Sequence, residues 1–218
     1  MGFENRAEAG RLLAGHLDKY RGQHPLVLAI PRGAVPMGKI VAEALDGELD
    51  VVLVRKLRAP YNPELAIGSI DETGAVYLDP DTRDLWDEPY LEGEKKTQLT
   101  TLRQRRQQYE PAGAVIDAAG RIAIVLDDGI ATGSTMIAAL RAVRARHPAK
   151  LIAATGVASA EALRLIRQEA DEVVCLETPA LLYAIGYHFR DFSQVTDEEV
   201  ITTLREARRP RVATGTST

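Results

Sequence analysis

The stretch IAIVLDDGIATGST, residues 122–135, begins as an unbroken apolar run, passes through two carboxylates and ends in glycines and hydroxyls. A short apolar run that stops at a turn-forming segment is typical of a buried strand. A helical pattern starts near Ser134, so the small-residue loop is expected to join the strand to a helix N-terminus. Backbone amides at such a terminus bind anions, and the hydroxyls add donors. The stretch therefore predicts a site for a phosphate group.

The same order of strand, loop and helix recurs on both sides of this stretch. Strands that alternate with helices predict an α/β fold, an open twisted parallel sheet with flanking helices. Ligands of such sheets bind beyond the carboxyl ends of the strands. We expect strands at 25–31, 49–57, 121–126, 150–157 and 172–177, and helices at 5–20, 34–45, 134–146 and 160–169.

Residues 58–115 interrupt this alternation, and we interpret them as a flexible-loop insertion into the sheet. Within it, LAIGSI at 65–70 and AVYLD at 75–79 are expected to pair as a hairpin. A polar helix is expected within 81–110. We expect a single domain over residues 1–208, with a small C-terminal hood at about 178–200 and a disordered tail at 209–218.

The composition limits which binding partners and which cellular location we expect. A net charge of −4 and a pI of about 5.7 give no reason to expect nucleic acid or an anionic membrane. The single cysteine, Cys175, excludes an intramolecular disulfide. No segment approaches the roughly 18 apolar residues of a membrane span, and the first residues lack the apolar core of a signal peptide. We therefore expect a cytoplasmic protein.

Charged residues near the predicted strand ends indicate a ligand with two anionic groups. Asp127 and Asp128 would repel a phosphate but suit hydroxyl groups, a magnesium ion or a developing positive charge. Arg32 follows the first strand, and Arg55 and Lys56 lie at the end of the second. Cations opposite a carboxylate pair indicate a second anionic group. A ribose with a phosphate at one end and a pyrophosphate at the other has this shape.

These segments together resemble a known family. IVLDDGIATGST at 124–135 resembles the phosphoribosyl pyrophosphate motif of type I phosphoribosyltransferases. IPRGAVPMGKIVAEAL at 30–45 and VVLVRKL at 51–57 resemble the pyrophosphate loop of that family and the strand that leads into its flexible loop. RAPYNPELAIGSI at 58–70 resembles a poorly characterised bacterial branch. The similarity spans roughly residues 25–205.

The resemblance implies magnesium-dependent transfer of a phosphoribosyl group from phosphoribosyl pyrophosphate to a nitrogenous acceptor, with release of pyrophosphate. The catalytic acids would be Asp127 and Asp128, which contact the ribose hydroxyls directly or through magnesium-bound water. It also implies an unusual peptide geometry in the pyrophosphate loop. The 5-phosphate would lie on Ala131, Thr132, Gly133, Ser134 and Thr135, and the pyrophosphate on Arg32, Gly33, Ala34, Arg55 and Lys56.

The acceptor pocket is expected in the hood, where Tyr187, Phe189 and Phe192 offer flat faces for a nucleobase-like acceptor. The 6-oxopurine enzymes of the family carry an aspartate at the position of Ala131. The resemblance therefore argues against a hypoxanthine or guanine acceptor. Related enzymes often complete their site across a dimer, which makes a homodimer an expectation here.

Several alternatives remain open from the residues alone. The loop hydroxyls could only cap a helix, Arg55 and Lys56 could be surface charges, and the hood aromatics could be core. A protein that senses phosphoribosyl pyrophosphate without turnover is a second function, supported by the basic residues at 101–106. Hydrolysis of a phosphate ester is a third, but the chain offers no evident nucleophile or dedicated base for it.

Overall fold

The computed structural model describes residues 2–109 and 112–209. Five strands form a parallel sheet in the order β2-β1-β6-β7-β8, which confirms the predicted open α/β architecture. These strands are β1 (Leu26–Ala29), β2 (Glu48–Val51), β6 (Ile122–Ile130), β7 (Lys150–Ala158) and β8 (Glu172–Glu177). Of the tail expected at 209–218, all but Arg209 lies outside the described residues.

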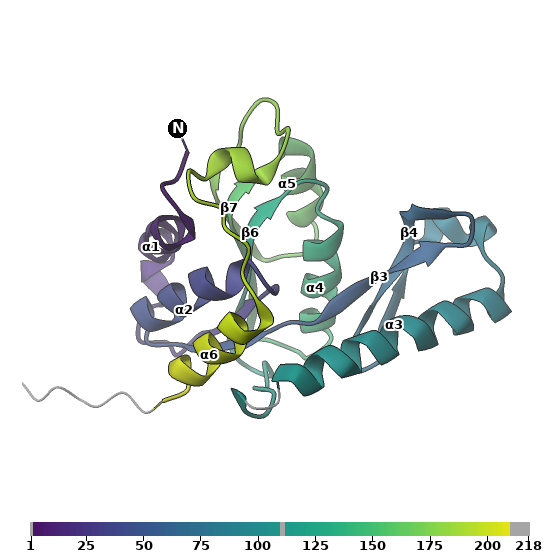
Figure 1. Cartoon of the computed structure of the whole chain (residues 1–218), viewed down its shortest axis with the longest axis horizontal. Coiled ribbons are helices and arrows are strands. Elements are labelled where there is room, and N and C mark those ends of the chain that lie inside the picture. The colour runs from purple at the N-terminus through teal and green to yellow at the C-terminus, as the bar shows by residue number, and fades with distance from the viewer. Residues whose placement is uncertain (1, 110–111, 210–218) are drawn as a thin grey trace, which may run out of the picture.

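Helices cover both faces of this sheet (Figure 1). One face carries α1 (Arg6–His16), α2 (Ala34–Ala44) and α6 (Asp197–Ala207), and the other carries α4 (Ser134–Arg144) and α5 (Ala160–Ile166). Successive residues of a strand point to opposite faces. Val27 and Ile124 accordingly belong to the core under α1 and α2, whereas Leu28 and Val125 belong to the core under α4 and α5. Both faces of the central strands are apolar because both are covered.

The predicted insertion forms a second sheet and a long helix, which together we call the arm (residues 54–109). Its antiparallel strands are β3 (Val54–Ala59), β4 (Asn62–Asp71) and β5 (Val76–Leu78), followed by a 3-10 helix at Pro80–Leu85 and α3 (Glu88–Tyr109). Gly68 pairs with Leu78 and Ile70 with Val76, so the predicted hairpin is confirmed. Strands β3 and β4 pack against α4, and Figure 1 shows the arm extending to one side of the core.

The second predicted strand, 49–57, is wrong as a single element. The chain leaves the parallel sheet after Val51 and enters the arm at Val54, with two buried residues between. The apolar run is continuous across this point, and no glycine or proline marks the break. Arg55 and Lys56 consequently lie in the arm and not at the edge of the parallel sheet.

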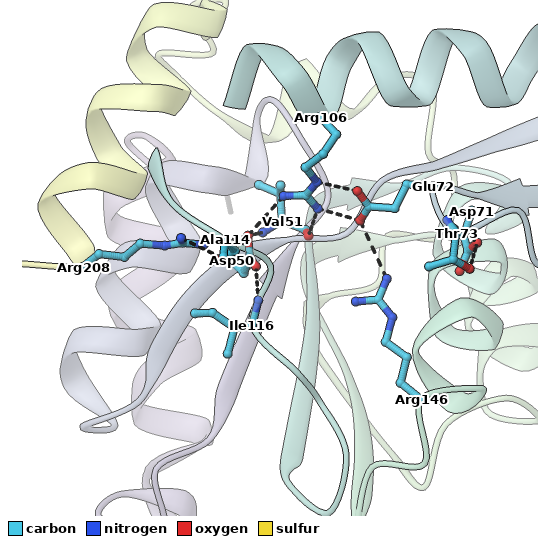
Figure 2. A network of polar contacts seen from close by, with 10 residues as sticks. All are labelled: Asp50, Val51, Asp71, Glu72, Thr73, Arg106, Ala114, Ile116, Arg146 and Arg208. Carbon is cyan, nitrogen blue, oxygen red and sulfur yellow. Dashed lines mark hydrogen bonds and ion pairs between the residues drawn. The ribbon is translucent and has the colours of Figure 1, made fainter. Parts of the chain in front are cut away.

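A network of charged side chains joins the arm to the core (Figure 2). Arg106 of α3 lies between Asp50 of β2 and Glu72 of the hairpin, with 3.6 Å from its Nη1 to Asp50 Oδ1. Asp50 is fully buried and also pairs with Arg208, just after α6, at 3.2 Å. Arg146 lies 3.8 Å from Glu72. These ion pairs hold together segments that are far apart in the sequence. The carboxylates need their cationic partners, because a buried charge without a partner strongly destabilises the fold.

The hood lies over the carboxyl end of the sheet and is tied to the N-terminal segment (Figure 1). The amide of Phe3 donates to the carbonyl of His188, and the amide of Arg190 donates to the carbonyl of Phe3. The hood contains a short 3-10 helix at Ile185–His188. Ile185 packs directly on Gly129 of β6. Within the part of the chain that the structure describes, no helix is long and apolar enough to cross a membrane.

Candidate active site

The two acids lie on β6 itself. The predicted strand ends at Leu126, but β6 continues to Ile130 because Gly129 and Ile130 still pair with β7. The amide of Asp128 donates to Asp127 Oδ1 over 2.9 Å. Burial and then the charge of Asp128 raise the pKa of Asp127 well above its usual range, although that hydrogen bond and Arg6 act in the opposite direction. The site therefore opposes ionisation of Asp127.

The carboxylate of Asp128 is held by a residue near the start of the chain. Arg6, the first residue of α1, places its Nε 2.8 Å from Asp128 Oδ2. Both side chains are 12% exposed. A charge-assisted contact of this kind between buried groups fixes the orientation of the carboxylate. Arg6 was not among the predicted site residues, and no spacing in the sequence connects it with Asp128.

The loop between β1 and α2 comes close to Asp128. A Cβ atom on Gly33 would lie 2.1 Å from Asp128 Oδ2, so only glycine fits there. The peptide bond between Pro31 and Arg32 is cis, which is an unusual geometry of the sort that the resemblance implies for this loop. The side chain of Arg32 turns to α6, with its Nη1 3.5 Å from Asp197 Oδ2. Its neighbour Gly33 is the N-cap of α2, and Ala34 is the first residue of that helix.

The predicted phosphate loop ends β6 and starts α4. Gly133 occupies the N-cap position with a φ of +84°, a conformation that other residues rarely adopt. The hydroxyls of Thr132 and Ser134 lie 3.1 Å apart. Ser159, in the loop after β7, donates to the carbonyl of Ala131 and so holds the loop in place. The loop has the backbone arrangement of an anion site at a helix N-terminus.

The arm brings cations close to this predicted phosphate loop. Arg55, Lys56 and Arg58 line a cavity of about 280 Å³ that Thr135 also lines. Lys56 also lines a second cavity of about 450 Å³, together with Thr132 and Ser134. Burial and then the charges of Arg58 and Arg105 lower the pKa of Arg55. Arginines gathered around one cavity indicate a site for an anion.

The hood aromatics are divided between core and surface. Phe189 is 5% exposed and packs between Phe3 and Phe192, with ring centroids 5.2 and 5.0 Å away. Phe192 also stacks on the guanidinium of Arg6. The expectation that Phe189 offers a flat face to an acceptor is therefore wrong, because its ring has almost no exposed surface. Tyr187, in contrast, is 82% exposed.

Comparison with known proteins identifies the family. A family model described as "Phosphoribosyl transferase domain" matches residues 4–188, a range that contains the acid pair, both loops and the arm. The chain belongs to the phosphoribosyl transferase family. The resemblance noted on the motifs at 30–45 and 124–135 is thereby confirmed.

Two related proteins and one solved structure cover most of this phosphoribosyl transferase chain. Proteins from two strains of Mycobacterium tuberculosis, named "Putative phosphoribosyl transferase MT0597" and "Putative phosphoribosyl transferase Rv0571c", are 40% identical over 209 residues. The match covers 95% of this chain and 47% of each relative, so the chain spans about half the length of these relatives. The crystal structure of TT1426 from Thermus thermophilus is 42% identical, with a TM-score of 0.88 over 94% of this chain and 99% of that one.

The donor set of this phosphoribosyl transferase fits a magnesium ion that arrives with a phosphorylated ligand. Among residues 2–109 and 112–209, no group of three or more His, Cys, Asp or Glu side chains could hold a metal. Asp127 and Asp128 offer carboxylate oxygens at one place. Magnesium usually keeps several waters and takes its other ligands from one or two carboxylates and from substrate phosphates. The pair suits that role, whereas it could not form a closed protein cage.

Sequence reasoning missed three cations of this site. Arg58 follows Arg55 and Lys56 closely in the chain, so the length of that basic run could have indicated it. Arg105 lines a small cavity with Thr135 and Arg55, and its only signal was the basic stretch of the polar helix. Arg6 had no signal at all, because its contact with Asp128 joins residues 122 positions apart.

Proposed function

We propose that the chain transfers a phosphoribosyl group from phosphoribosyl pyrophosphate to a nitrogenous, nucleobase-like acceptor and releases pyrophosphate. The observation that carries the proposal is the convergence of three features at one end of the sheet. These are the predicted phosphate loop at 131–135, the acid pair that precedes it, and the arm cations that line a cavity together with Thr135. A ligand with a phosphate, a diol and a pyrophosphate would use all three.

The proposed binding mode follows the charges. The 5-phosphate would lie on the amides and hydroxyls of 131–135, and the ribose hydroxyls would face Asp127 and Asp128. The pyrophosphate would lie between the backbone of the loop at 32–34 and the side chains of Arg55 and Lys56. When bound, magnesium would neutralise part of the pyrophosphate charge. Because Arg32 is engaged with Asp197, its side chain would reach the pyrophosphate only after leaving that partner.

In the proposed reaction, the bond from the anomeric carbon to pyrophosphate oxygen breaks and a bond from the acceptor nitrogen to that carbon forms. The electron pair of the broken bond leaves with pyrophosphate, and the acceptor loses its N–H proton to solvent. Positive charge develops on the ribose, where the acid pair would stabilise it. The arm cations would stabilise the charge that develops on the leaving group. Each group of residues thus has a role in the transition state and not only in binding.

The structure weakens the sequence support for a non-catalytic sensor. That support was the basic stretch at 101–106, which was expected on a helix surface. Arg106 instead belongs to the buried network with Asp50 and Glu72, and Arg105 faces the cavity at Thr135. Arg106 therefore forms ion pairs within the molecule, and Arg105 lines one of its cavities. We propose the enzyme alone, with an acceptor other than hypoxanthine or guanine because Ala131 replaces the aspartate of those enzymes.

The test is titration calorimetry with phosphoribosyl pyrophosphate and magnesium, followed by pyrophosphate release across a panel of nucleobases and other nitrogenous acceptors. Binding followed by release with one acceptor class would support the proposal and name the substrate. The Asp128→Asn variant should keep the fold and lose most of the transfer. Binding without release from any acceptor would favour a sensor, and absence of binding would remove the proposed function.

A further inference from the structure

The guanidinium of Arg6 contacts the acid pair and the hood at the same time. Its Nε lies 2.8 Å from Asp128 Oδ2, and its Nη1 donates to the carbonyl of Ser193 over 2.7 Å. Its central carbon lies 3.9 Å from the ring centroid of Phe192. One side chain therefore joins helix α1, the end of β6 and the hood. Arginine suits this position because its planar group can stack on a ring while it donates hydrogen bonds at its edge.

The pyrophosphate loop closes this arrangement from the other side. A Cβ atom on Gly33 would lie 2.1 Å from Asp128 Oδ2 and 3.1 Å from Nη2 of Arg6. Gly33, Arg6 and Asp128 therefore lie close together. The carboxylate oxygen that Arg6 contacts, Oδ2, is also the atom that a side chain at position 33 would strike. The terminal torsion of an aspartate is normally broad. Here Oδ2 is fixed, and the direction of Oδ1 is fixed with it.

We propose that Arg6 is a positioning residue for phosphoribosyl transfer, which holds Asp128 by Oδ2 so that Oδ1 faces the ribose hydroxyls and magnesium-bound water. The inference rests on the proposed function and adds to it a residue outside the motifs at 30–45 and 124–135. Arg6 does not touch the reacting atoms in this arrangement. It acts through Asp128, and it couples the hood to the acid pair through Phe192 and Ser193.

The effect of Arg6 on ligand binding can be separated from its effect on stability. We compare Arg6→Gln, Arg6→Lys and the control Arg11→Gln, which changes an exposed arginine on the same helix. Titration calorimetry with phosphoribosyl pyrophosphate and magnesium gives Kd, and circular dichroism shows that the protein is folded at the temperature used. We expect Arg6→Gln to weaken binding by about tenfold, Arg6→Lys by less, and Arg11→Gln not at all, in keeping with the energy of a charge-assisted contact.

A double-mutant cycle with Asp128→Asn decides whether Arg6 acts through Asp128. If it does, Arg6→Gln should change Kd by less than about twofold in the Asp128→Asn background, because the interaction is already gone. Equal effects of Arg6→Gln in both backgrounds, or wild-type affinity in Arg6→Gln, would overturn the inference and leave the proposed function standing. Absence of binding by the wild-type protein would overturn both.

Discussion

Gly33 and Asp128 lie so close together that a Cβ atom on residue 33 would come within 2.1 Å of the carboxylate oxygen Oδ2. The φ of Gly33 is −57°, which any residue adopts, so space and not backbone conformation requires glycine here. The contact joins the loop after β1 to the end of β6. It sets the position of an acid that we propose to be catalytic.

Replacement of Gly33 by alanine should displace the Asp128 carboxylate and break its contact with Arg6. We expect a loss of stability of about 1–3 kcal/mol, as in other overpacked sites, and at least a tenfold fall in affinity for phosphoribosyl pyrophosphate and magnesium. Thermal unfolding and calorimetry measure the two effects. Gly93→Ala is the control, because a Cβ at that helical position would meet nothing within 4 Å beyond its chain neighbours and the backbone of its own helix. Unchanged affinity in Gly33→Ala would show that the position of Asp128 is unimportant.

Gly133 should be essential for a different reason, which is its backbone conformation. A valine at a φ of +84° carries strain of order 1–3 kcal/mol, and relief of that strain would move the amides of the phosphate loop. We expect Gly133→Val to abolish detectable binding of phosphoribosyl pyrophosphate. Gly120→Val provides a matched control, since Gly120 has a φ of +66° in the turn before β6 and open space around it. Gly120→Val should lose stability and keep its affinity. Equal losses of affinity in Gly133→Val and Gly120→Val would mean that Gly133→Val acts through global folding and not through the loop.

The carboxylate of Asp127 should destabilise the folded, unliganded protein. Its pKa in the folded state lies well above the usual range because of burial and the charge of Asp128. An acid with a raised pKa destabilises the folded state at any pH where the group must ionise. Asp127→Asn keeps an oxygen that can accept from the amide of Asp128, so we expect it to gain about 1 kcal/mol, or roughly 2–4 °C in Tm, at neutral pH. The same variant should lose most of its transfer activity, and a lower Tm would contradict the expected direction.

Local patterns predicted the parallel sheet and the loop at 131–135 that leads into α4, because the signals for both lie in neighbouring residues. The apolar run at 122–126 predicts a buried strand, and the small residues at 131–135 predict a loop. The hairpin at 65–79 was predictable for the same reason, since two alternating segments flank a turn. The family could be recognised from these short stretches, and the match over residues 4–188 agrees.

Features that depend on distant partners could not be predicted. The break after Val51 occurs within a continuous apolar run and is decided by which strand each half pairs with. The burial of Phe189 results from packing against Phe3, which lies at the other end of the chain. The helix α6 was missed although its capping box, Thr196 with Glu199, is a local signal that could have been found.

The network around Arg106 should decide how firmly the arm is attached. Without Arg106, the buried charges of Asp50 and Glu72 are less well compensated (Figure 2). Removal of one partner of a buried ion pair typically costs about 3–5 kcal/mol. We expect Arg106→Met to lower the free energy of unfolding by this order and to increase amide hydrogen exchange in β4 and β5. Arg103→Met, at an exposed position of the same helix, is the control. Wild-type exchange in the arm of Arg106→Met would show that other contacts attach it.

Glu172 should make stability depend on pH in the acidic range. Burial opposes its ionisation, but hydrogen bonds from Lys19, Tyr20 and Lys150 outweigh it and lower the pKa of Glu172 to about 2. The Tyr20 hydroxyl lies 2.5 Å from Glu172 Oε2, and Lys150 Nζ lies 3.1 Å from the same oxygen. Since the folded pKa is below the ordinary value of 4.5, the stabilisation is complete above pH 4.5 and is lost as the pH falls toward 2.

The Glu172→Gln variant tests this pH dependence directly. Because the group is partly exposed and screened by solvent, we expect wild type to be more stable than Glu172→Gln by about 1 kcal/mol at pH 6. The difference should shrink steadily between about pH 4.5 and pH 3, as the wild-type carboxylate gains a proton in the unfolded state. Urea unfolding of both proteins at several pH values measures it. A difference that stays constant over this range would mean that Glu172 stabilises the fold through its shape and packing and not through its charge.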